Sequence, residues 1–101
     1  MEIKAKSSDR NLLLEFRGDM DHHGARNALK ELEMTVDAAL PKTLVLDMGG
    51  VTFMDSSGIA VLLRTWRHME RLGGTMRVIH TPTQADKVFR AAGLQRLITF
   101  E

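Results

Sequence analysis

Residues 43–63 read TLVLDMGGVTFMDSSGIAVLL and contain the transition that decides the fold, from a short strand through a polar turn into an apolar helix. The segment Thr43–Met48 is almost continuously apolar, which predicts a strand covered on both faces, as in a parallel sheet. We expect a turn at Gly49-Gly50, because paired glycines favour chain reversal. From about Ser57 to Leu72 the apolar residues follow the 3.6-residue period of a helix, namely Ile59, Leu62, Leu63, Trp66 and Met69.

The chain before this stretch predicts a hairpin and a helix. Residues 2–6 and 11–17 form two extended segments, and Ser8-Asp9-Arg10 supplies the turn between them. Residues 21–40 form a long amphipathic helix, which Asp19 or Asp21 caps and Pro41 stops. Its apolar positions recur every three or four residues: Ala25, Leu29, Leu32, Val36 and Leu40.

The chain after this stretch repeats the alternation of strand and helix. Gly73-Gly74 ends the preceding helix, and residues 75–80 form the next strand. Thr81 is expected to cap a third helix, with Pro82 at its first position and Gln84 completing the capping box. That helix ends at Gly93, and residues 97–100 form a short edge strand.

This order predicts one α/β domain spanning residues 1–101. Its sheet is mainly parallel and four- to five-stranded, because strands that alternate with helices are joined by right-handed crossovers. The initial hairpin adds an antiparallel edge, and the helices pack against the sheet. We find no internal repeat and no linker that would divide the chain.

Composition narrows the classes of function. The 101 residues include 14 Lys and Arg against 13 Asp and Glu, a net charge of +1, which argues against duplex nucleic acid or an anionic membrane as the partner. The absence of Cys excludes disulfides and thiolate chemistry and favours a reducing cytoplasm. The longest apolar run, Ile59–Leu63, is far shorter than the roughly 20 residues that span a bilayer, and the N-terminus shows no targeting segment.

The segment Asp55-Ser56-Ser57-Gly58 allows two interpretations. In the first, Ser56 or Ser57 caps the helix and Gly58 permits close packing. In the second, the positive end of the helix dipole and its free N–H groups hold a phosphate on serine. Such a phosphate adds about −1.5 to −2 charges at pH 7, and Asp55 opposes it, so that modification changes the surface a partner meets more than it changes stability.

Catalytic and metal-binding alternatives find weaker support. The run Asp21-His22-His23 offers a carboxylate and two imidazoles, but neighbouring helical residues diverge and no zinc spacing is present, so we expect no metal. A Ser/His/Asp hydrolase remains an alternative, although the Gly-x-Ser-x-Gly elbow is missing. The sequence contains no Gly-rich phosphate loop, which argues against a nucleotide hydrolase or a dinucleotide enzyme, and we expect no cofactor.

Four segments together resemble the bacterial anti-sigma-factor antagonists, which are stand-alone STAS domains. They occur in the family's order and spacing: Gly18-Asp19-Met20-Asp21-His22-His23, Phe53-Met54-Asp55-Ser56-Ser57-Gly58, Arg71-Leu72-Gly73-Gly74 and Val88-Phe89-Arg90-Ala91-Ala92-Gly93-Leu94. The resemblance covers nearly the whole chain and is greatest to the sporulation type, the antagonist that frees sigma factor F. The Asp-Ser-Ser-Gly segment is its most specific part.

The resemblance implies a phosphorylation-controlled binding protein in the cytoplasm that has no catalytic activity of its own. The unphosphorylated form binds an anti-sigma factor that is also a serine kinase and so releases the sigma factor, a partner switch that promotes transcription during sporulation. Phosphorylation of Ser56 ends binding, and a serine phosphatase restores it. The family's partner surface maps to Asp21, Asp55, Ser56, Ser57 and Gly58, and helical phase extends it to Arg64 and Arg67.

The same family includes members without a phosphorylation cycle. The alternative function is therefore that of a STAS accessory subunit in a transport complex, because one fold serves both roles.

Overall fold

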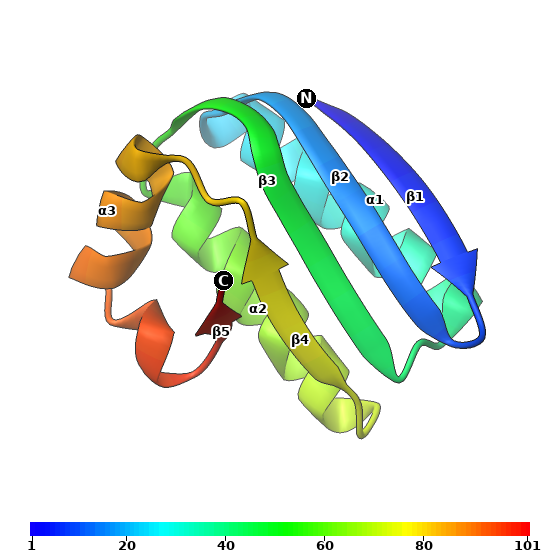
Figure 1. Ribbon diagram of the computed structural model, residues 1–101. Helices are drawn as coiled ribbons and strands as arrows, with labels where there is room; N and C mark the ends of the chain where they lie inside the picture. The colour runs from blue at the N-terminus through cyan, green and yellow to red at the C-terminus, as the bar shows by residue number, and fades with distance from the viewer.

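The computed structural model describes residues 1–101 as a five-stranded sheet with helices against one of its faces (Figure 1). The elements follow one another along the chain as β1 (Glu2–Ser8), β2 (Asn11–Met20), α1 (His22–Ala39), β3 (Thr43–Met54), α2 (Ser57–Arg71), β4 (Thr75–Ile79), α3 (Thr83–Ala91), the 3-10 turn η1 (Leu94–Arg96) and β5 (Thr99–Phe100). Strand order in the sheet equals chain order, β1-β2-β3-β4-β5. The β1–β2 pair is antiparallel and the other pairs are parallel, which confirms the predicted fold class.

The hairpin at the N-terminus forms as predicted, with a longer second strand. Ser8 pairs with Asn11, and the two turn residues between them, Asp9 and Arg10, both have positive φ angles of 48° and 66°. Two consecutive residues of this conformation match the right-handed twist of the flanking strands. β2 continues to Met20, beyond the predicted end at residue 17.

Only one face of the sheet is covered. In Figure 1, α1 and α2 lie behind the sheet, and the face toward the viewer carries no helix. Burial along β3 alternates accordingly, since Leu44 and Leu46 are fully buried whereas Val45 and Asp47 are partly exposed. The prediction of a strand covered on both faces was therefore wrong, because the apolar Val45 lies on the open face.

Gly49-Gly50 does not form the predicted turn, because β3 runs through both residues to Met54. A side chain at Gly50 would overlap the neighbouring strand, with an ideal Cβ 2.6 Å from the carbonyl oxygen of Phe16. The β2–β3 register shifts at this point, between Glu15 and Arg17. Glycine is thus required here for a close approach of two strands at an irregularity and not for chain reversal.

The core lies between the sheet and the helices and comprises 22 buried apolar residues. Of the predicted stripe on α1, Ala25, Leu32 and Val36 are buried, whereas Leu40 is 52% exposed. Leu40 lies beyond the helix in a left-handed conformation, φ 45°, and its N–H donates to the carbonyl of Val36. It therefore ends α1 instead of extending the stripe, before Pro41 is reached.

The C-terminal elements differ from the prediction in their capping. α3 begins at Thr83 with Pro82 in the N-cap position, and the hydroxyl of Thr81 has no hydrogen-bond partner, so the predicted capping box does not form. Gln84 instead accepts from the N–H of Met54 at 2.9 Å and donates to its carbonyl at 2.7 Å. This pairing fixes the end of β3.

None of the helices has both the length and the apolar character needed to cross a bilayer.

Candidate functional site

The starts of α1 and α2 lie side by side at one end of the sheet. β2 and β3 are parallel and end level with each other, because Met20 pairs with Met54. The N–H of Asp55 donates to the carbonyl of Met20 at 3.3 Å and so joins the two connections. The carboxyl ends of parallel strands are the usual place for a site in an α/β sheet, and here they bring Asp21 beside the Asp-Ser-Ser-Gly segment.

Ser56 is exposed at the N-cap position of α2 and makes no capping hydrogen bond. Asp55 closes the helix start instead: its Oδ1 accepts from the N–H of Ser57 at 2.8 Å, and its carbonyl accepts from the N–H of Gly58 at 3.1 Å. The N–H of Ile59 donates to the carbonyl of Ser56 at 3.1 Å. Ser56 holds the N-cap position, as one interpretation predicted, but neither serine hydroxyl forms a capping hydrogen bond. The N–H groups of Ser57, Gly58 and Ile59 are paired and not free, contrary to the other interpretation. The Ser56 hydroxyl therefore does not stabilise the start of α2 through a capping hydrogen bond.

Gly58 is buried and permits close packing, as one interpretation of the motif held. An ideal Cβ at this position would lie 2.6 Å from Sδ and 2.9 Å from Cγ of Met54. Met54 is itself fully buried at the end of β3. Gly58 therefore brings α2 against the strand and presents no side chain to a partner.

Asp21 caps α1, as one of the two predicted alternatives. Its Oδ1 accepts from the N–H of Gly24 at 2.8 Å, which satisfies one otherwise unpaired donor of the first turn. The other alternative, Asp19, accepts from the hydroxyl of Thr52 on β3. His22 and His23 follow in the first turn of α1, and both are exposed.

The cap gives a first prediction. Replacement of Asp21 by Ala is expected to lower the free energy of unfolding by about 1 kcal/mol, because the Gly24 N–H loses its acceptor. Urea unfolding followed by circular dichroism measures the change. Asp21→Asn keeps a capping oxygen and should lose only a few tenths of a kcal/mol. Equal losses in the two variants would show that the cap is not the source of the effect.

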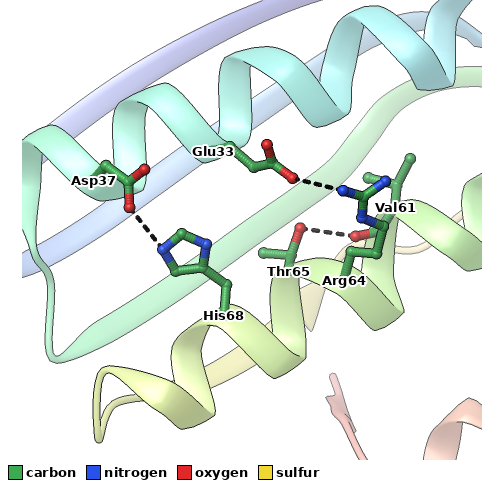
Figure 2. Close-up of polar contacts among 6 residues, drawn as sticks. All are labelled: Glu33, Asp37, Val61, Arg64, Thr65 and His68. Carbon is green, nitrogen blue, oxygen red and sulfur yellow. Dashed lines mark hydrogen bonds and ion pairs between the residues drawn. The ribbon is translucent and has the colours of Figure 1, made fainter.

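Arg64 and Arg67 lie farther along α2, on its exposed side. Figure 2 shows Arg64 reaching across to Glu33 of α1, with an Nη2 to Oε1 distance of 3.3 Å. One turn later, Nε2 of His68 lies 2.8 Å from Oδ1 of Asp37. Arg67 forms no ion pair and is exposed. The structure thus places Ser56 and both predicted arginines on one helix.

Two hollows follow the line along which α1 and α2 meet, which we call the α1–α2 seam. The first, about 220 Å³, begins beside Ser57 and is largely apolar; its lining is His22, Ala25, Arg26, Leu29, Ser57, Ala60 and Val61. The second, about 190 Å³, is entirely polar and is lined by Glu33, Arg64, Arg67, His68 and Arg71. The α1–α2 seam therefore changes from apolar to basic along its length, and Ser57, Arg64 and Arg67 of the predicted partner surface line its hollows.

Phe53 is a surface residue at this end that the sequence analysis did not assign to the site. Its side chain is 46% exposed, although it lies only two residues before Asp55. The exposure of Phe53 was not predicted, because a turn was expected at Gly49-Gly50. Without a strand that continues to Met54, the face on which Phe53 lies could not be assigned. With the strand running to Met54, the buried Met54 fixes its neighbour Phe53 on the other face.

Comparison with known proteins gives a consistent result. The model of the STAS domain family matches residues 2–101. The anti-sigma F factor antagonist of Lysinibacillus sphaericus is 25% identical over 83 residues, which cover 82% of this chain and 71% of that protein. The unphosphorylated form of the anti-sigma factor antagonist SpoIIAA has a TM-score of 0.79 and 22% identity, over 99% of this chain and 88% of its own. The phosphorylated form of SpoIIAA, a Bacillus cell fate determinant, has a TM-score of 0.75 and 20% identity, over 99% and 91%.

Proposed function

The chain belongs to the STAS domain family, and from this premise we propose that it is an anti-sigma-factor antagonist whose binding is controlled by phosphorylation of Ser56. In its unphosphorylated form it binds an anti-sigma factor, and the sigma factor is released for transcription. The anti-sigma factor is also the serine kinase, and a serine phosphatase resets the cycle in the cytoplasm. By analogy with its anti-sigma F relatives, the sigma factor serves sporulation.

The observation that carries this proposal is the exposed Ser56 hydroxyl, which makes no capping bond. A kinase must bring this oxygen to the γ-phosphate of ATP, and a hydroxyl buried in the core or engaged in a cap would have to be freed first. Asp55 maintains the helix start through Ser57 and Gly58, so esterification of Ser56 leaves these hydrogen bonds intact. The first turn of α2 therefore keeps its conformation when the phosphate is added.

The position of Asp55 also determines what the phosphate does. Its carboxylate already accepts from the N–H of Ser57, the donor that an anion at the helix start would otherwise use. A phosphate on Ser56 thus gains little from the helix terminus and meets a like charge beside it. The added charge of about −1.5 to −2 remains on the surface that the partner contacts, and repulsion and desolvation weaken docking there.

The chain acts in this cycle by binding and as the substrate of its partners, and it catalyses neither reaction itself. In the kinase reaction, the Ser56 oxygen forms a bond to the γ-phosphorus of ATP, the bond from that phosphorus to the bridging oxygen of ADP breaks, and the hydroxyl proton passes to the kinase. In the reset reaction, the oxygen of a water molecule bonds to the phosphorus, the bond from phosphorus to the Ser56 oxygen breaks, that oxygen takes up a proton from the water, and inorganic phosphate leaves. Both partners supply the catalytic groups.

Phosphate mapping tests the assignment. Incubation with the anti-sigma factor kinase and ATP is expected to place one phosphate on Ser56, detected by tandem mass spectrometry of the digested protein. The Ser57→Ala variant should accept the phosphate as the wild type does, and Ser56→Ala should accept none. Phosphate that appears only on Ser57 or on Thr52 would refute the assignment.

A further inference from the structure

A single stripe on the exposed side of α2 joins the phosphorylation residue to three arginines. Successive members are three or four residues apart, which places them on one face of a helix: Ser56, Ala60, Arg64, Arg67 and Arg71. All five are exposed. We call this set the α2 stripe.

The α2 stripe is basic in a chain that is otherwise balanced. α2 contains three arginines and a single carboxylate, Glu70, whereas the whole protein has a net charge of +1. Only one of the three arginines, Arg64, forms an ion pair, and its partner is Glu33. The side chain of Arg64 is 60% exposed and that of Glu33 is 44% exposed. Exposed ion pairs of this kind contribute little to the stability of the fold. Arg67 and Arg71 have no carboxylate partner within ion-pair distance, and their charge is open to an incoming molecule.

The apolar hollow of the α1–α2 seam adjoins this stripe at Ala60. Its apolar walls are formed by Ala25 and Leu29 from α1 and by Ala60 and Val61 from α2. Three polar residues complete the lining: His22, Arg26 and Ser57. Its volume, about 220 Å³, is sufficient for one apolar side chain of a partner. An apolar hollow followed by unpaired arginines is a surface for a segment that carries both apolar and acidic residues.

We infer that the α2 stripe docks an acidic amphipathic segment of the anti-sigma factor, with an apolar side chain in the hollow beside Ser57 and carboxylates on Arg64, Arg67 and Arg71. This inference rests on the proposed function and adds the chemistry of the partner surface. Arginine suits the role because its planar donors bind a carboxylate through two hydrogen bonds. The apolar hollow favours a protein segment over a nucleic acid, which would also bind arginine but offers no aliphatic anchor.

An acidic partner segment gives the switch a physical cause. Ser56 lies on the same stripe as the arginines, at its N-terminal end. A segment that follows the stripe with carboxylates therefore passes the Ser56 phosphate, and the two negative surfaces repel each other. The phosphate adds to the negative charge of Asp55 at the N-terminal end of the stripe, and this repulsion accounts for release without a change of backbone conformation.

Charge reversal of the two unpaired arginines tests the inference. The double variant Arg67→Glu/Arg71→Glu is expected to bind the anti-sigma factor at least tenfold more weakly than wild type in isothermal titration calorimetry. The matched control is Arg96→Glu, an exposed arginine on η1 away from the stripe, which should bind as wild type does. Wild-type affinity should fall as NaCl rises from 50 to 500 mM, and that of the double variant should fall less.

The possible outcomes separate this inference from the proposed function. If the double variant binds as tightly as wild type and Ser56 phosphorylation still releases both, the inference is overturned and the proposed function stands. If the unmodified wild type does not bind the anti-sigma factor at all, the proposed function fails and the inference with it. Displacement of the anti-sigma factor by a single-stranded DNA oligonucleotide would overturn the acidic protein segment as the occupant. Circular dichroism verifies folding, and Arg67→Gln/Arg71→Gln, which removes charge without reversing it, should give a smaller loss of affinity.

Discussion

A Ser56→Asp variant is expected to bind the anti-sigma factor about 100-fold more weakly than a Ser56→Ala variant, a difference of about 2.7 kcal/mol in binding free energy. Both substitutions remove the hydroxyl, and both change the same exposed residue at the N-cap of α2. Neither removes a structural hydrogen bond, because Asp55 closes the helix start. The difference between the two variants therefore reports the effect of one negative charge at the docking surface, which surface plasmon resonance measures as a change in dissociation rate.

The matched control for this comparison places the same charge elsewhere. Ser8 is an exposed serine at the end of β1, and Ser8→Asp adds an identical carboxylate on the hairpin. We expect Ser8→Asp to bind as wild type does. Equal binding by Ser56→Asp and Ser56→Ala would mean that charge at this position does not control docking, and the proposed switch would have to be abandoned.

Gly24→Ala is expected to have the largest effect on stability, a loss of about 2 kcal/mol in the free energy of unfolding. Gly24 is buried in the first turn of α1, where an ideal Cβ would overlap the backbone carbonyl oxygen of Asp19 and lie 3.4 Å from Oδ1 of Asp21. The overlapping atom belongs to the main chain, so the connection between β2 and α1 must move. The gain of about 1 kcal/mol in helix propensity from Gly to Ala offsets only part of this cost.

Guanidinium unfolding of Gly24→Ala and of Asn27→Ala separates the two terms. Asn27 is exposed on the same helix, so its replacement adds helix propensity without a steric overlap. We expect Asn27→Ala to be slightly more stable than wild type. A Gly24→Ala protein with wild-type stability would show that the connection yields easily, contrary to the hydrogen bonds of Asp19 with Thr52 and of Asp55 with Met20 that hold it.

The sequence predicted the elements of this fold well and their ends less well. Apolar periodicity located the first two helices, because the core imposes a regular apolar pattern on one face of each of them. The third helix was placed from a capping box that does not form, and β3 was placed from a continuous apolar run. The prediction of a turn at Gly49-Gly50 was wrong, because Gly50 is required by the close approach of Phe16 on the neighbouring strand and not by a local chain reversal. The cap at Thr81 failed for a similar reason, since Gln84 pairs with Met54 thirty residues earlier in the chain. Contacts between distant segments determine such details, and a local pattern does not contain them.

In the candidate site, too, features that depend on consecutive residues were predicted, and features that depend on contacts between distant segments were not. Asp21 was correctly included among the possible caps, because a cap depends on a few consecutive residues. The competition between Asp55 and Ser56 for the start of α2 was decided by side-chain geometry, which the order Asp-Ser-Ser does not reveal. The pairing of Arg64 with Glu33 and of His68 with Asp37 requires the packing of α1 beside α2. Arg67 and Arg71 could be recognised as unpaired only once that packing was known.

The sequential order of the five strands bears on how the molecule is synthesised. Each strand pairs with the strand that precedes it in the chain, so none has to be inserted between two that are already joined. The hairpin of β1 and β2 can form first, and β3, β4 and β5 can then be added at one growing edge as they leave the ribosome. A nascent chain of this topology has a native surface on which each new strand can assemble from its first hairpin onward.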